Sequence, residues 1–202
     1  MSKTHVVYLA GEPGVGKSTA MSNLTDGYHR AVVSHKLKGG PARETLERDT
    51  EQVGVELGRR HGPHPEGFPG TDAMSMSAIV GVESWLVSGD AARETPLVLG
   101  EGARLANRRF VRACLIGGVK LTVVYFHDPV GADRRRKARG GKQNETWVRG
   151  QATRAANFYA MARHVMVTTD ADVHCEFIRG EHPEAAVETL RRITGLDRLP
   201  VA

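Results

Sequence analysis

Apolar and polar positions follow two different rhythms along this chain, and the two rhythms take turns. Short runs of consecutive apolar and β-branched residues are typical of strands that are buried on both faces of a parallel sheet. Longer stretches with an apolar residue every three or four positions are typical of amphipathic helices. The pattern predicts strands over residues 5–10, 30–35, 95–102, 120–126 and 165–169, and helices over residues 18–24, 77–88, 104–116, 144–163 and 183–193.

The alternation of strands and helices predicts an α/β fold in which helices cover both faces of a mostly parallel sheet. We therefore expect a three-layer α/β/α arrangement with a five-stranded sheet, formed by residues 1–202 as a single domain. Residues 42–60 are ambiguous, because 42–52 are rich in helix formers whereas 53–57 alternate like a short strand. Residues 61–70 contain three prolines and three glycines, which predict a loop.

The stretch Gly11-Glu12-Pro13-Gly14-Val15-Gly16-Lys17-Ser18 stands between the first predicted strand and the first predicted helix. It matches the Gly-x-x-x-x-Gly-Lys-[Ser/Thr] pattern of the phosphate-binding P-loop. Its glycines let backbone N–H groups approach a ligand, and the helix N-terminus adds partial positive charge. We predict that the phosphates of ATP or GTP bind here, that Lys17 acts on the β- and γ-phosphates, and that the Ser18 hydroxyl ligates Mg²⁺. The residues expected to contact the nucleotide are Gly11, Pro13, Gly14, Val15, Gly16, Lys17, Ser18 and Thr19.

Two acidic residues are the next candidates for chemistry. Ligands bind at the carboxyl ends of the strands in open parallel sheets, and Glu101 directly follows the apolar run Leu97–Leu99. Its carboxylate would hold Mg²⁺ through water or accept a proton from an acceptor hydroxyl, with a helix cap as the alternative. Asp72 follows the Pro- and Gly-rich loop, where it would bind the acceptor, act as the base in place of Glu101, or simply cap the next helix.

Residues 130–142 are basic and loop-like, and they lie between a predicted strand and a predicted helix. This position predicts a lid, over approximately residues 130–150, whose arginines neutralise charge on a phosphoryl group in transfer. Arg135 and Arg139 are our candidates for that catalytic role, and a solvated run of charge is the alternative. Arg149 and Arg154 on the following helix could face the same cleft.

The net charge of +5 is spread unevenly, with a balance of −3 over residues 1–101 and +8 over residues 102–202. A basic second half favours contact with nucleic acid or a segment that grips phosphate. No run of about 18 apolar residues exists, so we expect no membrane span. Cys114 and Cys175 lie far apart without a metal-type spacing, and we expect reduced thiols in a cytoplasmic protein.

The P-loop, Gly100-Glu101-Gly102 and the Arg-rich segment together resemble the P-loop nucleoside and nucleotide kinase group. Residues 70–77, 101–105, 143–147 and 150–154 are similar, more narrowly, to small P-loop kinases encoded by bacteriophages. The resemblance covers about residues 5–165 and implies a phosphotransferase that depends on ATP and Mg²⁺. Some phage kinases of this type are thought to phosphorylate 5-hydroxymethylated pyrimidines within DNA, and others act as nucleoside-monophosphate kinases.

The leading hypothesis is therefore a kinase for a hydroxyl on a nucleotide-type acceptor, in the host cytoplasm if the chain is phage-encoded. The preferred acceptor is a 5-hydroxymethylated pyrimidine in phage DNA, because the second half of the chain is basic. A free nucleoside monophosphate is the first alternative, although Glu101-Gly102-Ala103-Arg104 replaces the Asp-Arg-[Tyr/His/Ser] element that such kinases carry. A P-loop NTPase that hydrolyses its nucleotide without an acceptor is the second alternative.

Overall fold

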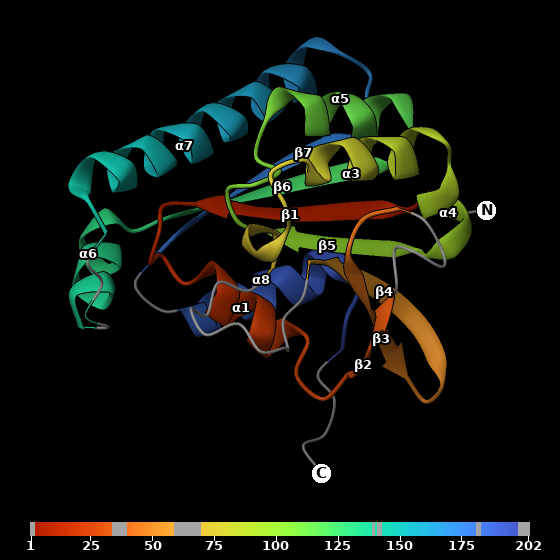
Figure 1. Cartoon of the computed structure of the whole chain (residues 1–202), viewed down its shortest axis with the longest axis horizontal. Coiled ribbons are helices and arrows are strands. Elements are labelled where there is room, and N and C mark those ends of the chain that lie inside the picture. Colours follow the sequence, from red (N-terminus) through yellow and green to blue (C-terminus); the bar gives the residue numbers. More distant parts are fainter. Residues whose placement is uncertain are drawn as a thin grey trace.

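The computed structural model describes residues 3–33, 40–58, 70–138, 140, 143–180 and 183–197. These residues form a seven-stranded sheet between two layers of helices (Figure 1). The strands are β1 (His5–Gly11), β2 (His29–Val33), β3 (Arg43–Arg48), β4 (Glu51–Leu57), β5 (Leu97–Glu101), β6 (Lys120–His127) and β7 (Val173–Arg179). Their order across the sheet is β2-β3-β4-β5-β1-β6-β7.

Five strands of this sheet, β4, β5, β1, β6 and β7, run parallel to one another, and β3 is antiparallel to both β2 and β4. The expected α/β fold with a mostly parallel sheet is thus confirmed. The sheet is wider than the five strands that the sequence predicts, because the ambiguous residues 42–60 supply two further strands, β3 and β4.

Helices cover both faces of the sheet (Figure 1). They are α1 (Lys17–Leu24), α3 (Ala78–Val87), α4 (Asp90–Glu94), α5 (Arg108–Ile116), α6 (Pro129–Ala138), α7 (Glu145–Thr168) and α8 (Pro183–Thr194), with a short 3₁₀ helix, η1 (Thr71–Ala73). Helices α3, α5 and α7 lie on one face, and α1 and α8 lie on the other. No helix in the described part of the chain is both long and apolar enough to cross a membrane.

The central strand β1 explains why its sequence is apolar at nearly every position. Val6 and Tyr8 pack into the cluster beneath α3, α5 and α7, whereas Val7 and Leu9 pack into the cluster beneath α1 and α8. All four side chains are fully buried, because successive residues of a strand point to opposite faces and both faces are covered.

The sequence does not clearly predict strand β3, because most of its residues are charged. Arg43 is only 1% exposed and forms an ion pair with Glu94, with 2.6 Å between Nε and Oε1. In the neighbouring strands, Arg30 lies 3.0 Å from the carboxylate of Glu44 and 2.7 Å from that of Glu56, both nearly inaccessible to solvent. Buried charges of this kind are tolerated only when they are paired.

Two further expectations for the second half of the chain are wrong. The expected strand over residues 165–169 is the last turn of α7 and the residue after it, and the last strand is β7 instead. The expected loop at residues 130–142 is largely the helix α6, because Asp128 accepts the N–H of Gly131 at 2.9 Å and Pro129 occupies the first helical position.

Candidate active site

The P-loop joins the carboxyl end of β1 to α1, and its glycines take the backbone angles that the sequence requires of them. Gly11 and Gly14 have φ values of 149° and 86°. A Cβ atom at Gly11 would lie 2.5 Å from the carbonyl oxygen of Phe126, and one at Gly14 would lie 2.7 Å from that of Ala132. Neither position therefore accepts a side chain.

The start of α1 is prepared for an anion. Its N-cap residue, Gly16, has a φ of 104° and supplies no side chain to cap the first N–H groups of the helix. These N–H groups and the positive end of the helix dipole are the features that bind phosphate at a helix N-terminus. Lys17, Ser18 and Thr19 form the first turn of this helix, so the chemistry of the loop fits the nucleotide phosphates that the sequence predicts.

Lys17 projects across this loop. Its ammonium group donates hydrogen bonds to the carbonyl oxygens of Gly11, at 2.9 Å, and of Glu12, at 3.0 Å. Burial lowers the pKa of Lys17, while the nearby carboxylates of Glu101, Asp72 and Glu12 act in the opposite direction. The structure therefore brings Lys17 and the two predicted acidic residues to one place.

Glu101 is the last residue of β5 and pairs in register with Leu9 of β1, two residues before the P-loop begins. Its side chain is almost completely buried, with 2% exposed. Ser18 approaches the same edge of the sheet from the first turn of α1. A hydroxyl group and a carboxylate are the protein ligands that Mg²⁺ commonly uses when water and phosphate oxygens complete its coordination.

Among the residues that the structure describes, no group of three or more His, Cys, Asp or Glu side chains could form a metal cage. Mg²⁺ at phosphate-transfer sites is bound through one or two carboxylates together with the substrate, so such a cage is not required. Ser18 and Glu101 therefore fit the role of metal ligands.

Tyr8 and Thr71 hold the backbone around Glu101, and sequence reasoning missed both. The Thr71 hydroxyl donates a hydrogen bond of 2.6 Å to the carbonyl oxygen of Glu101. The Tyr8 hydroxyl donates one of 2.9 Å to the carbonyl oxygen of Gly102 and lies 3.1 Å from the Thr71 hydroxyl. Both side chains are fully buried, and burial raises the pKa of Tyr8, so this phenol stays a neutral donor. Tyr8 stands among aliphatic residues in its strand, and a buried phenol needs a hydrogen-bond partner. This feature of the sequence could have pointed to the contact.

Asp72 also binds the segment that follows Glu101. Its Oδ1 atom accepts the backbone N–H groups of Ala103, at 2.9 Å, and Arg104, at 3.1 Å. Gly102 has a φ of 114°, and a Cβ atom there would lie 2.8 Å from the Asp72 carboxyl carbon. The helix α3 begins later, after Ser77, so Asp72 does not cap it. Asp72 thus holds the backbone of residues 103 and 104, directly after Glu101 and Gly102.

The arginines of α6 contact the outer rim of the P-loop. Arg135 donates a hydrogen bond of 2.9 Å to the carbonyl oxygen of Gly14 and one of 2.7 Å to the carboxylate of Asp128. Arg136 donates one of 3.2 Å to the carbonyl oxygen of Pro13. Arg139 lies outside the described residues. The predicted basic segment is therefore next to the P-loop, and Arg135 holds its backbone.

Glu12 ties the P-loop to the end of β6, and sequence reasoning gave it no role. Its side chain is 5% exposed, and its Oε1 atom accepts the backbone N–H of Asp128 at 3.1 Å. The same oxygen lies 3.3 Å from Nδ1 of His127. This contact follows from the pairing of β1 with β6, which places the residues after Gly11 beside those after Phe126.

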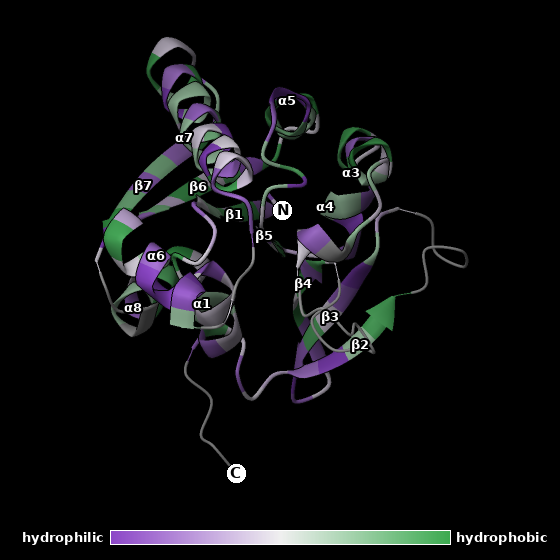
Figure 2. Ribbon diagram, turned by 60° about the vertical axis from the view of Figure 1, so that its left-hand side comes forward, coloured by the Kyte–Doolittle hydropathy of each residue, from purple (hydrophilic) through white to green (hydrophobic). Residues whose placement is uncertain are grey.

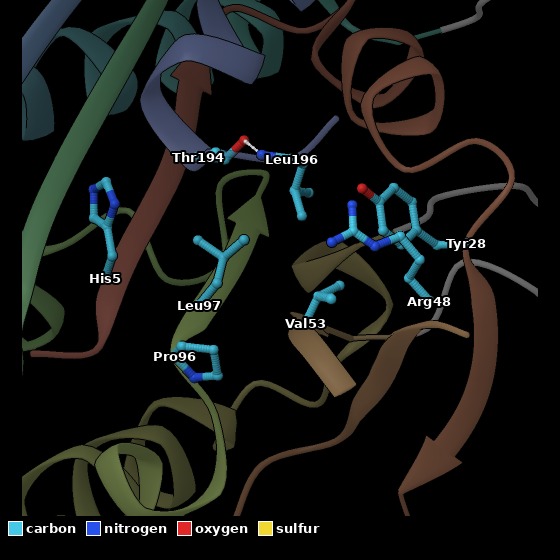
Figure 3. A pocket seen from close by; sticks show the side chains of 9 residues that line it. His5, Tyr28, Arg48, Val53, Pro96, Leu97, Thr194 and Leu196 are labelled. Carbon is cyan, nitrogen blue, oxygen red and sulfur yellow. Dashed lines mark hydrogen bonds between the residues drawn. The ribbon is translucent and has the colours of Figure 1, made fainter. Parts of the chain in front are cut away.

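Two cavities differ in their relation to this site. A groove of about 420 Å³ lies between the start of α5 and the middle of α7, a few residues beyond Glu101. A smaller cavity of about 180 Å³ is lined by His5 and Leu97 among others (Figure 3). His5 and Leu97 are the first residues of β1 and β5, whereas the P-loop follows the last residue of β1. The smaller cavity therefore lies at the opposite edge of the sheet from the P-loop.

Comparison with known families agrees with this geometry. A family model described as P-loop Nucleotide Kinase3 matches residues 2–195. The chain belongs to this family. No curated protein matches it significantly.

The match to P-loop Nucleotide Kinase3 includes the P-loop, Glu101, Asp72 and α6. Membership supports a P-loop kinase in general, and with it a nucleotide ligand of the ATP and Mg²⁺ type. The resemblance to P-loop nucleotide kinases that the sequence carries is confirmed at this level. Its narrower likeness to phage kinases, and the roles of single residues, remain predictions.

Proposed function

We propose that this protein transfers the γ-phosphoryl group of ATP to a hydroxyl group of a nucleotide-type acceptor. One observation supports this most directly: the Lys17 ammonium lies among the carboxylates of Glu101, Asp72 and Glu12 at the mouth of the P-loop. A P-loop that only binds a nucleotide needs its lysine, but transfer to a hydroxyl also uses a base that accepts the hydroxyl proton beside the γ-phosphate. Glu101 supplies a carboxylate for that role from the adjacent strand.

In this proposal, the N–H groups of the P-loop and of the first turn of α1 bind the β- and γ-phosphates. Lys17 leaves the carbonyl oxygens of Gly11 and Glu12 and donates to phosphate oxygens instead. Ser18, and Glu101 through water, would hold Mg²⁺, which would neutralise charge on the β- and γ-phosphate oxygens.

The acceptor hydroxyl oxygen forms a bond to the γ-phosphorus, and the bond from that phosphorus to the β–γ bridging oxygen breaks, so that ADP leaves. The hydroxyl proton passes to the Glu101 carboxylate, with Asp72 as the second candidate base. Arg135 and Arg139 remain our candidates for neutralising the transferred phosphoryl group. Arg135 would do so from its position on the P-loop rim, where it contacts Gly14.

Our preferred acceptor is a 5-hydroxymethylated pyrimidine in phage DNA. The support is the charge of the second half of the chain, with a balance of +8 over residues 102–202. A basic surface binds the DNA backbone through phosphate contacts and counterion release. A free nucleoside monophosphate is the alternative acceptor.

The test is incubation of the protein with [γ-³²P]ATP and either an oligonucleotide that contains 5-hydroxymethylated pyrimidine or a panel of mononucleotides. The proposal predicts label in the modified oligonucleotide and none in an oligonucleotide of the same sequence with unmodified pyrimidines. Label that appears only in mononucleotides would overturn the DNA acceptor and retain the kinase chemistry.

A further inference from the structure

The groove between α5 and α7 begins close to the proposed base. It is lined by Asn107 and Arg108 at the start of α5 and by Gly150 and Arg154 on α7, among others. Phe158 forms part of its wall, and the ring of Phe158 packs against Tyr8, with 5.5 Å between ring centroids. The Tyr8 hydroxyl donates a hydrogen bond to the carbonyl oxygen of Gly102. Tyr8 therefore connects Phe158 in the groove wall to the backbone next to Glu101. Figure 2 shows α5 and α7 on the same side of the sheet.

Two arginines that line the groove have no charged partner among the residues that the structure describes. Arg108 and Arg154 are exposed, and neither forms an ion pair or hydrogen bond within the part of the chain that the structure describes. By contrast, Arg109, the next residue on α5, pairs with Glu83. Two unpaired guanidinium groups that face one groove are placed to bind anions, and guanidinium groups match phosphate geometry well.

Gly150 has no explanation in the packing of the protein. It lies inside the long helix α7, where glycine is less favourable than alanine. A Cβ atom at Gly150 would meet no atom of the described residues within 4 Å, apart from its own helix backbone and chain neighbours. Glycine lets a ligand approach the backbone closely, and Gly150 lies in the lining of this groove.

Trp147 extends the same face of α7. It stands seven residues before Arg154, a spacing that places both side chains on one side of the helix, and 44% of Trp147 is exposed. Aromatic side chains at the edge of a basic groove stack on nucleic-acid bases, and each stacked base contributes about 1–3 kcal/mol.

We infer that this groove binds a single strand of DNA, with backbone phosphates at Arg108 and Arg154 and a base stacked on Trp147. The close approach at Gly150 then brings the strand toward Glu101, where the hydroxyl of an unstacked base would react. This inference rests on the proposed function, since it supplies the acceptor-binding surface for the same site. A free nucleotide has a single phosphate terminus and does not require two separated arginines together with a stacking residue.

The test is binding of a fluorescein-labelled single-stranded 12-mer, measured by anisotropy without ATP at several salt concentrations. Arg108→Gln and Arg154→Gln should each weaken binding about fivefold at 0.1 M salt and lower the slope of log K against log salt by about 0.7. The matched control is Arg163→Gln, which changes an exposed arginine of the same helix outside the groove and should leave binding unchanged.

Gly150→Ala separates a binding role from a structural one. Since alanine favours the helix, this variant should raise Tm by about 2–4 °C and still weaken binding of the 12-mer. Equal binding by the wild type, Arg108→Gln, Arg154→Gln and Gly150→Ala would overturn the inference. Weakened use of a mononucleotide acceptor with unchanged 12-mer binding would also overturn it, by assigning the groove to a free nucleotide. Because binding is measured without ATP, its result is independent of whether the wild type transfers phosphate.

Discussion

Arg135 donates a hydrogen bond of 2.9 Å to the carbonyl oxygen of Gly14, the central glycine of the P-loop. The same guanidinium also binds the carboxylate of Asp128, which caps the helix that carries Arg135. The arginine expected to face the transferred phosphate thus holds the loop that binds the phosphates. The shape of the P-loop and the position of α6 therefore both depend on the side chain of Arg135.

We expect Arg135→Ala to weaken ATP binding about tenfold, because a hydrogen bond between a charged group and a buried partner contributes about 1.5–3 kcal/mol. The measurement is calorimetric titration with a non-hydrolysable ATP analogue. Arg134→Ala is the matched control, since Arg134 is exposed on the same helix and forms no hydrogen bond with the P-loop within the described part of the chain. Equal affinities for both variants would show that Arg135 does not maintain the loop.

Asp128 should make the stability of this region depend on pH. Its burial acts to raise its pKa, but the hydrogen bonds from Arg135 and from the N–H of Gly131, with the charge of Arg135, outweigh burial and hold the pKa below 3.8. A carboxylate with a lowered pKa in the folded state stabilises the fold above its unfolded pKa. This contribution is lost as the pH falls below 3.8 toward the folded value.

The measurement is the free energy of urea unfolding for the wild type and Asp128→Asn at pH 7, 5 and 3. We expect a difference of about 1 kcal/mol between the two proteins at pH 7 and pH 5, which shrinks at pH 3. A difference that stays constant down to pH 3 would contradict the assignment.

Asp72 and Glu101 lie side by side, and their variants should behave differently. We expect Glu101→Gln to bind ATP normally and to lose phosphoryl transfer, since the amide neither accepts the proton nor holds the metal well. Asp72→Asn keeps an oxygen that can accept the N–H groups of Ala103 and Arg104, so it should retain most of kcat. Loss of transfer in Asp72→Asn with near-normal transfer in Glu101→Gln would reverse the two roles. Single-turnover transfer assays provide the comparison.

The fold and the P-loop could be predicted because their signals are local. The strand before the P-loop is apolar at each buried position, and a glycine stands at each point of positive φ in the loop, such as Gly11 and Gly14. Local patterning also predicted the acidic residue at the end of β5, because the carboxyl ends of parallel strands gather at one edge of a sheet.

The parts that sequence reasoning missed depend on contacts between distant residues. Residues 42–52 are rich in helix formers, but Arg43 and Glu44 lie in the strand β3. Both are buried there, and they form ion pairs with Glu94 and Arg30. The β-branched residues from Val165 onward favour a strand, but Val165 and Met166 pack against the same core cluster as Phe158 and so continue one face of α7. Intrinsic propensity is a weak guide where tertiary contacts decide the structure.

The helix α6 could have been predicted with closer attention to local chemistry, whereas the contacts of Asp72 could not. Asp128-Pro129 is a strong N-terminal helix signal, because aspartate caps the helix and proline suits its first position. The contacts of Asp72 with the backbone at 103 and 104 span about 30 residues of sequence, and no spacing rule predicts them.

We expect the γ-phosphoryl group to end on an acceptor hydroxyl rather than on water. The most direct measurement is the partition of label from [γ-³²P]ATP between acceptor and inorganic phosphate, for the wild type and Lys17→Ala. We predict label in the acceptor with the wild type and a rate lower by several orders of magnitude with Lys17→Ala, which should remain folded by circular dichroism because only phosphate-directed charge is lost. Release of inorganic phosphate at a rate unaffected by any acceptor, with no label in the acceptor, would contradict the account.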